Sequence, residues 1–114
     1  MPIDVLFASV PVASLEPARA WYEQLFGRQP DITPNEAEEM WQATDGAWLY
    51  VVVDPQRAGR TLVTLAVPDL DAEVAALSDR GLEVESVETV GAAGRKAWFH
   101  DPDGNAVALI EVHG

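Results

Sequence analysis

The sequence predicts an α+β fold in which one βαβββ unit occurs twice. Helix-period and strand-period segments run in the order strand, helix, three strands, and the same order then begins again. Residues also recur, since "VPVASL" from Val10 resembles "LAVPDL" from Leu65, and "MWQATDG" from Met40 resembles "WFHDPDG" from Trp98. The chain has 114 residues, 48% of them hydrophobic, which suits one domain with a modest core. We therefore expect a single domain over residues 1–114, with halves at about 3–54 and 61–112.

The first half begins with a strand over residues 3–12, where Val and Phe are frequent. An amphipathic helix follows in "SLEPARAWYEQLFG", with Ser14 as its expected N-cap and Gly27 as its stop. A short strand near residues 31–33 precedes strands at 40–44 and 47–54. The Asp45–Gly46 pair between the last two strands predicts a tight hairpin turn.

The second half repeats this order. A strand is expected over residues 61–67, and a helix in "DLDAEVAALSDRG" is capped by Asp69 and stopped by Gly81. Three more strands are expected at 83–90, 96–100 and 106–112. The last two flank "DPDGN", where Asp101 and Asp103 are expected to accept hydrogen bonds from backbone N–H groups of the turn.

Charge and composition argue against several classes of function. The net charge of −12, from 19 acidic and 7 basic residues, repels phosphate backbones, so we expect no nucleic-acid partner. The acidity favours solubility, and it would also attract a cationic small molecule. The chain has no cysteine, which excludes disulfides, zinc–thiolate sites and thiol nucleophiles. Because no apolar run approaches membrane-spanning length, we expect a cytoplasmic protein with no membrane contact.

The duplicated unit resembles the vicinal oxygen chelate superfamily, which includes glyoxalases, bleomycin resistance proteins and extradiol dioxygenases. The resemblance rests on "V-x-x-L" from Val12, on "A-W-Y-x-x-L-F-G" from Ala20 and on "DPDGN" before the last strand, and it covers essentially the whole chain. It implies a curled, cup-shaped mixed sheet with the helices on its outer face. It also implies a homodimer with a cavity for a small molecule.

In enzymes of this superfamily, four cavity-facing positions supply His, Gln or Glu ligands to a divalent metal. The resemblance places these positions at Phe7 and Leu62 on the first strand of each half, and at Tyr50 and Ala108 on the last strand. Phe7, Leu62 and Ala108 have no atom that can bind a metal, and a single phenol is a poor site. Glu111 has the wrong parity to share the face of Ala108. We therefore expect no metal ion and no cofactor.

Strand alternation then predicts a cavity lined by aromatic and apolar side chains with a few polar groups. Residues of one parity on each strand share a face, so the four positions select their neighbours. The expected ligand-binding residues are Phe7, Ser9, Met40, Gln42, Trp48, Tyr50, Leu62, Thr64, Trp98, His100 and Ala108. Such a lining is typical of small-molecule pockets, and aromatic faces stack flat ligands and attract cations. Trp21 and Trp41 are expected in the core or in an interface.

Three hypotheses for the function remain open. The main hypothesis is a metal-free protein that binds an apolar or aromatic small molecule, with antibiotic sequestration as a role. In one version of this hypothesis the molecule is cationic. The second is a lyase, isomerase or dioxygenase of the same superfamily, which either holds a metal at other positions or uses Tyr50 or His100 as acid or base. The third is a subunit whose aromatic surface pairs with a protein. For His100, a structural hydrogen bond beside the "DPDGN" turn is the first expectation, and general-base chemistry is the second.

Overall fold

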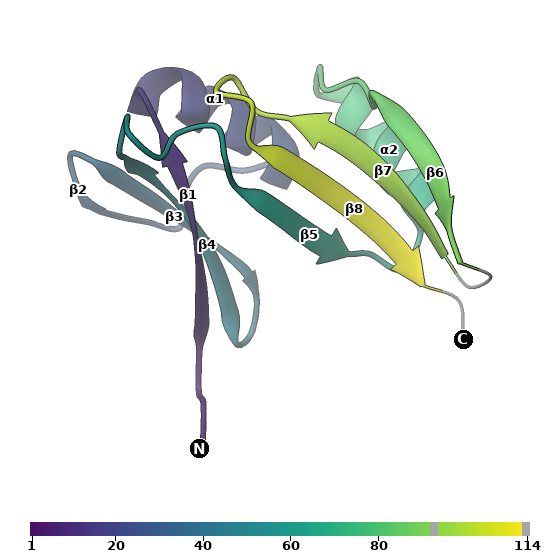
Figure 1. Cartoon of the computed structure of the whole chain (residues 1–114), viewed down its shortest axis with the longest axis horizontal. Coiled ribbons are helices and arrows are strands. Elements are labelled where there is room, and N and C mark those ends of the chain that lie inside the picture. The colour runs from purple at the N-terminus through teal and green to yellow at the C-terminus, as the bar shows by residue number, and fades with distance from the viewer. Residues whose placement is uncertain (92–93, 113–114) are drawn as a thin grey trace.

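The computed structural model describes residues 1–91 and 94–112, and it confirms an α+β fold with a pair of βαβββ units. The first unit consists of β1 (Leu6–Val12), α1 (Leu15–Phe26), β2 (Ile32–Asn35), β3 (Glu38–Thr44) and β4 (Ala47–Val53). The second consists of β5 (Leu62–Ala66), α2 (Leu70–Asp79), β6 (Ser86–Val90), β7 (Gly94–His100) and β8 (Ala106–Val112) (Figure 1). The expected elements are all present, with some ends shifted by a few residues.

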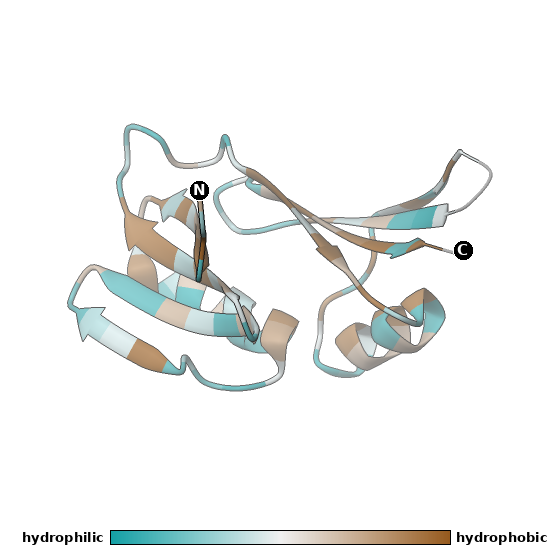
Figure 2. Ribbon diagram, turned by 90° about the horizontal axis from the view of Figure 1, so that it is seen from below, coloured by the Kyte–Doolittle hydropathy of each residue, from teal (hydrophilic) through white to brown (hydrophobic). Residues whose placement is uncertain are grey.

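The strands form two separate four-stranded sheets. The first sheet has the order β1-β4-β3-β2 and the second has the order β5-β8-β7-β6. β1 and β5 each pair in parallel with the last strand of their own unit, and the other neighbours are antiparallel. The expected curled sheet is therefore divided in two, and Figures 1 and 2 show the two sheets lying beside each other. β1 and β5 each keep one edge without a strand partner among the described residues.

The two helices begin and end near the predicted capping residues. Gly27 ends α1 with a φ of 72°, and its N–H donates to the Glu23 carbonyl at 2.8 Å. The Asp69 side chain caps α2 by accepting from the Ala72 N–H at 3.1 Å. Ser14 occupies the N-cap of α1 without a side-chain capping bond. No helix within the described residues is long and apolar enough to cross a membrane.

The hydrophobic core lies between each sheet and its helix. α1 packs on β3 and β4, whereas α2 packs on β7 and β8. Alternate strand residues point into this core, and they are Val10, Val12, Trp41, Leu49 and Val51 in the first unit and Ala97, Phe99, Val107 and Leu109 in the second. Trp21 and Trp41 are both buried there, as expected. Because burial fixes one parity of each strand, it also fixes which residues point away from the helices.

The "DPDGN" turn joins the second unit to the first through buried hydrogen bonds. Asp101 Oδ1 accepts from the backbone N–H groups of Asp103 and Asn105, both at 2.9 Å, as predicted for an aspartate in such a turn. Asp101 Oδ2 accepts from the Tyr22 hydroxyl of α1 at 3.0 Å and from Asn105 Nδ2 at 2.8 Å. The same Asn105 amide donates to the carbonyl of Pro11 in β1 at 2.9 Å. We call Tyr22, Asp101 and Asn105 the polar junction.

The polar junction changes the acidity of its phenol. Tyr22 is fully buried. Burial raises the pKa of the Tyr22 hydroxyl far above its usual value, and the negative charge of Asp101 raises it further. The hydroxyl therefore stays a hydrogen-bond donor under conditions in which an exposed tyrosine ionises.

The linker between the units passes close to the same turn. Gly59 has a φ of 87°, which side-chain-bearing residues rarely adopt. A β-carbon at this position would lie 2.5 Å from the carbonyl oxygen of Asp103. Both the backbone conformation and the lack of space require glycine here.

Candidate functional site

Each sheet has one face against its helix and an opposite face that neither α1 nor α2 covers, which we call the open face. Strand pairing and parity determine its members. The open face of the first sheet carries Phe7, Ser9, Met40, Gln42, Trp48 and Tyr50, and that of the second carries Leu62, Thr64, Trp98, His100 and Ala108. All the predicted ligand-binding residues thus lie on open faces. Their role in binding stays a prediction.

The open face of the first sheet is aromatic and partly exposed. Phe7 is 54% exposed although it is a large hydrophobic residue. Its ring centroid lies 6.5 Å from that of Tyr50 in an edge-to-face arrangement. Trp48 is half-buried beside Phe7 in the strand register. Gln42 contributes less to this surface, because its Nε2 donates to the Asp45 carbonyl of the hairpin turn at 3.2 Å.

On the second sheet, Trp98 lies at the centre of a charged cluster. Its indole Nε1 donates to Glu88 Oε1 at 2.9 Å. The Lys96 ammonium lies 4.9 Å from the centroid of the same indole, which is a favourable cation–π arrangement. Glu88 and Lys96 are opposite each other in the pairing of β6 with β7. This face therefore combines an aromatic ring with charges of both signs.

His100 is held in place by Glu85, which precedes β6. The imidazole Nδ1 lies 2.7 Å from Glu85 Oε1, and Glu85 Oε2 accepts from the backbone N–H of His100 at 2.7 Å. The two side chains are 46% and 48% exposed. The contact is a structural hydrogen bond of the kind expected for His100, although its partner lies outside the "DPDGN" turn. It also leaves Nε2 as the ring nitrogen for any acid–base chemistry.

The four positions that hold a metal in related enzymes do not fit one here. Phe7 and Leu62 are exposed hydrocarbon side chains, and Ala108 is fully buried. Tyr50 supplies a single phenol. Within residues 1–91 and 94–112, no three His, Cys, Asp or Glu side chains are placed to share a metal ion. His113 lies outside the described residues.

Strand alternation alone did not identify Glu85, Glu88 or Lys96 as neighbours of the predicted site. Lys96 and Trp98 are two residues apart on one strand, so the sequence predicts that they share a face of the sheet. The sequence does not predict which residues of β6 lie beside them, because the pairing of β6 with β7 depends on the register set across the loop between these strands. Arg95, which is adjacent to Lys96 in sequence, points to the helix side and donates to Asp71 at 3.1 Å.

A hollow of about 660 Å³ lies where the two units meet, away from most of the predicted site. It is bordered by Phe26 of α1, Leu77 of α2, the β3–β4 hairpin and β5. Thr64 belongs both to the predicted site and to this lining, whereas Phe7 and Trp98 do not line it. The hollow is therefore distinct from the main part of the open face.

The lining of this hollow corresponds to the polar junction in the internal repeat. The helix alignment that pairs Leu15 with Leu70 also pairs Tyr22 with Leu77. The hairpin alignment that pairs Gly46 with Gly104 likewise pairs Asp101 with Ala43 and Asn105 with Ala47. At one place the units are joined by hydrogen bonds, and at the corresponding place smaller apolar side chains border a hollow.

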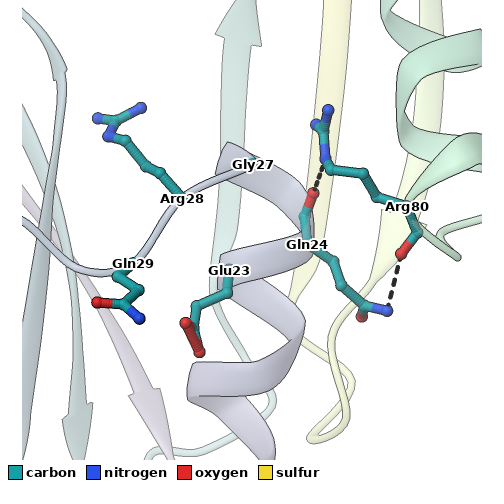
Figure 3. A pocket seen from close by; sticks show the side chains of 6 residues that line it. All are labelled: Glu23, Gln24, Gly27, Arg28, Gln29 and Arg80. Carbon is teal, nitrogen blue, oxygen red and sulfur yellow. Dashed lines mark hydrogen bonds between the residues drawn. The ribbon is translucent and has the colours of Figure 1, made fainter.

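A smaller hollow of about 330 Å³ surrounds the C-terminal end of α1. Figure 3 shows that Gln24 and Arg80 bind each other there, with Gln24 Nε2 donating to the Arg80 carbonyl at 3.0 Å and Arg80 Nε donating to the Gln24 carbonyl at 2.6 Å. Arg80 Nη2 also donates to the Leu25 carbonyl at 3.0 Å. Arg28 is engaged with Asp31 at 3.1 Å. The guanidinium groups thus serve structural contacts at this helix end.

Comparison with known proteins identifies the family. The family model described as Glyoxalase/Bleomycin resistance protein/Dioxygenase superfamily matches residues 4–109. The chain belongs to this superfamily. The resemblance inferred from the duplicated unit and the "DPDGN" turn is confirmed. No curated protein matches the chain.

Solved structures of this superfamily share the fold over nearly the whole chain. A glyoxalase/bleomycin resistance protein from Catenulispora acidiphila DSM 44928 is 42% identical, with a TM-score of 0.89 and coverage of 95% of this chain and 97% of that one. TnmS3, an antibiotic binding protein from Streptomyces sp. CB03234, is 28% identical, with a TM-score of 0.73 and coverage of 95% and 94%. A lactoylglutathione lyase from Agrobacterium tumefaciens has the same fold at 19% identity, with a TM-score of 0.73 and coverage of 97% and 95%. Because proteins described as binding proteins and as enzymes share this fold, the fold alone does not determine the function.

Proposed function

We propose that the chain binds an apolar or aromatic small molecule on its open faces without a metal ion. The observation that carries the proposal is the exposure of large hydrophobic residues on the side of the sheets that no helix covers. Phe7 is 54% and Leu62 is 60% exposed, and the half-buried rings of Trp48, Tyr50 and Trp98 share these faces. Grouped exposed apolar residues with a few polar neighbours mark binding surfaces.

Two further observations support this function. The similarity to TnmS3, described as an antibiotic binding protein, supports antibiotic sequestration as the role. The hydrocarbon side chains at Phe7, Leu62 and Ala108 support binding without a metal, because none of them offers a donor atom. We place this function in the cytoplasm, in a chain that acts as one domain.

We also propose that a second copy of the chain completes the cavity. Among the residues that the structure describes, β1 and β5 each have one edge without a strand partner, and an unpaired strand edge readily pairs with another chain. Phe7 and Leu62 lie on these two strands, so a partner there would cover exposed apolar surface. Figure 1 shows that the N-terminal segment before β1 projects from the body, and Ile3 within it is exposed. A symmetric dimer would place the same contacts in both copies.

The four tryptophans provide an internal test of ligand binding. In a two-dimensional NMR titration with quinoline, a neutral planar compound, we expect the indole N–H signals of Trp48 and Trp98 to shift. The signals of Trp21 and Trp41 should move little, because these residues are buried in the core. Quinoline shifts that spare both open-face indoles, or a stoichiometric metal ion bound by open-face residues in protein purified without chelator, would contradict the proposal.

Light scattering coupled to size-exclusion chromatography tests the dimer. We expect a dimer for the wild type and a monomer for Leu62→Glu. Val87→Glu is the matched control, because Val87 is 50% exposed but lies on β6. A monomeric wild type, or a Leu62→Glu protein that remains dimeric, would count against a shared cavity. A monomer whose open face is instead covered by another protein would favour an interaction subunit.

The His100–Glu85 pair supports one other function, metal-independent proton transfer. Glu85 fixes the imidazole through Nδ1, and an oriented imidazole is a suitable general base. A test is the exchange of solvent deuterium into the acidic C–H positions of phenylpyruvate, an aromatic carbon acid. Exchange that is faster than in buffer and is lost in His100→Gln would support this function. Equal exchange with both proteins would exclude it for this class of substrate.

A further inference from the structure

We infer that Lys96 occupies the cation-recognition position on Trp98, so that Trp98 and Glu88 select a cationic aromatic ligand, which must displace Lys96. This inference rests on the proposed binding of a small molecule at the open face. It goes beyond that function by naming the charge of the ligand and by assigning Lys96 as an internal competitor.

The Trp98 ring is suited to a positive group. The face of an indole is the strongest aromatic acceptor for a cation. Trp98 is oriented by its hydrogen bond to Glu88 at 2.9 Å, and Ala108 is its direct neighbour on β8. The carboxylate of Glu88 adds negative charge beside the same ring. The position is thus built for a positive group, and in the free protein the ammonium of Lys96 lies there, 4.9 Å from the ring centroid.

Lys96 is held weakly at this ring. Among the described residues, Lys96 forms no ion pair, and its ring contact is the interaction that places it. Glu88 is engaged with the indole N–H. Lys96 and Trp98 are both half-buried at the surface, and a lysine held there by one cation–π contact on a flexible stem is easily displaced, since it regains rotamer freedom when it leaves.

Negative charge remains beside Trp98 when Lys96 is displaced. The open face of the second sheet keeps the carboxylates of Glu88 and Glu85, while the Lys96 charge has moved away. The whole chain carries a net charge of −12, which adds attraction at long range. A planar cation can therefore use both the indole face and the nearby negative charge, whereas a neutral ring of the same size uses the indole face alone.

The test compares N-methylquinolinium with quinoline, which has nearly the same shape and is neutral in mildly alkaline buffer. Lys96→Met keeps the length of the side chain and removes its charge. We expect this variant to bind N-methylquinolinium about two- to fivefold more tightly than the wild type, the range that one cation–π contact at a protein surface supplies. Arg57→Met is the control for net charge, because Arg57 is an exposed linker residue whose ion-pair partner is Asp54. It should change the affinity for N-methylquinolinium much less than Lys96→Met does and should leave the affinity for quinoline unchanged.

A second variant tests the carboxylate. Glu88→Gln keeps an oxygen that can accept the indole N–H but removes the negative charge. It should weaken binding of N-methylquinolinium and leave binding of quinoline nearly unchanged. Equal losses for both compounds would mean that Glu88 acts only by orienting the ring.

Displacement of Lys96 can also be observed directly by NMR. In the free protein the side-chain methylene protons of Lys96 near Trp98 should be shifted upfield by the ring current, and they should move towards ordinary values as N-methylquinolinium saturates the site. If the compound binds while these signals stay in place, or if Lys96→Met binds it no better than wild type, the inference is overturned. If neither compound binds the wild type or any variant, the proposed binding function fails as well as the inference. This result differs from binding without displacement of Lys96, which overturns the inference alone.

Discussion

Replacing Tyr22 with phenylalanine removes one hydroxyl from the polar junction and should lower the free energy of unfolding at neutral pH by about 1.5–3 kcal/mol. This magnitude follows from the contacts of Asp101. The Tyr22 hydroxyl donates to Asp101 Oδ2 at 3.0 Å in a buried setting, and buried hydrogen bonds to charged groups lie in this range. The loss stays within it because Asp101 Oδ2 keeps the bond from Asn105 Nδ2 at 2.8 Å and is not left without a donor.

The pH dependence provides a sharper test of the same bond. The pKa of Tyr22 is raised far above its usual value, first by burial and then by Asp101, so its stabilising contribution is fully present below the unfolded pKa near 10. Above that pH the unfolded chain loses the phenol proton while the folded chain keeps it. The Tyr22 hydroxyl should therefore lower the free energy of unfolding of the wild type by up to about 1.4 kcal/mol per pH unit above this pH. Tyr22→Phe has no such hydroxyl and should not show this loss.

Urea unfolding of both proteins between pH 7 and pH 11.5 measures this difference. We expect the gap between wild type and Tyr22→Phe to be constant up to about pH 9.5 and to shrink above the usual tyrosine pKa of about 10. Tyr50→Phe is the control, because the Tyr50 hydroxyl makes no hydrogen bond with another described residue, and it should change stability by less than about 0.5 kcal/mol. A stable Tyr22→Phe protein, or a gap that does not narrow in alkali, would refute the reasoning.

Three other substitutions and one control probe the linker, the polar junction and the first unit. Gly59→Ala places a β-carbon against a backbone carbonyl at a φ of 87° and should cost more than about 1–2 kcal/mol in unfolding free energy, whereas Gly91→Ala, with positive φ but open space, should cost less. Asn105→Ala removes the amide that bonds the Pro11 carbonyl and leaves buried groups unpaired, so it should lower the free energy of unfolding measured in urea by about 2–4 kcal/mol. The hydrogen bond from Arg28 holds the pKa of the Asp31 carboxyl below its usual value. The ionised carboxylate therefore stabilises the folded chain fully above the unfolded pKa of Asp31, and this stabilisation is lost as pH falls through the folded pKa. Asp31→Asn should therefore lower stability at neutral pH, and acid titration should show the difference disappearing.

Sequence alone predicted the elements well because local signals agree with the fold. The capping aspartate Asp69, the stop at Gly27 and the alternation in β4 and β8 each have a local cause, and each is present in the structure. Glu111 shows that parity is also predictable. It lies on the helix side of β8, where its Oε1 accepts from the Leu70 N–H at the start of α2 at 2.8 Å.

Contacts between distant segments could not be predicted in the same way. Tyr22 looks like an ordinary apolar member of an amphipathic helix, and its bond to Asp101 arises only when the two units pack together. The neighbours of Trp98 on β6 depend on the strand register. Local sequence patterns also could not predict the division into two sheets. This division depends on whether β1 and β5, which are far apart in sequence, pair with each other within one chain.

The contrast between the polar junction and the hollow at the corresponding place bears on the origin of the chain. Tyr22, Asp101 and Asn105 correspond to Leu77, Ala43 and Ala47. An ancestor assembled from two identical βαβββ units would carry the same side chains at both places, and so would have either two polar ties or two hollows. Fusion into one chain releases the two copies to diverge independently, and the asymmetry observed here requires that release.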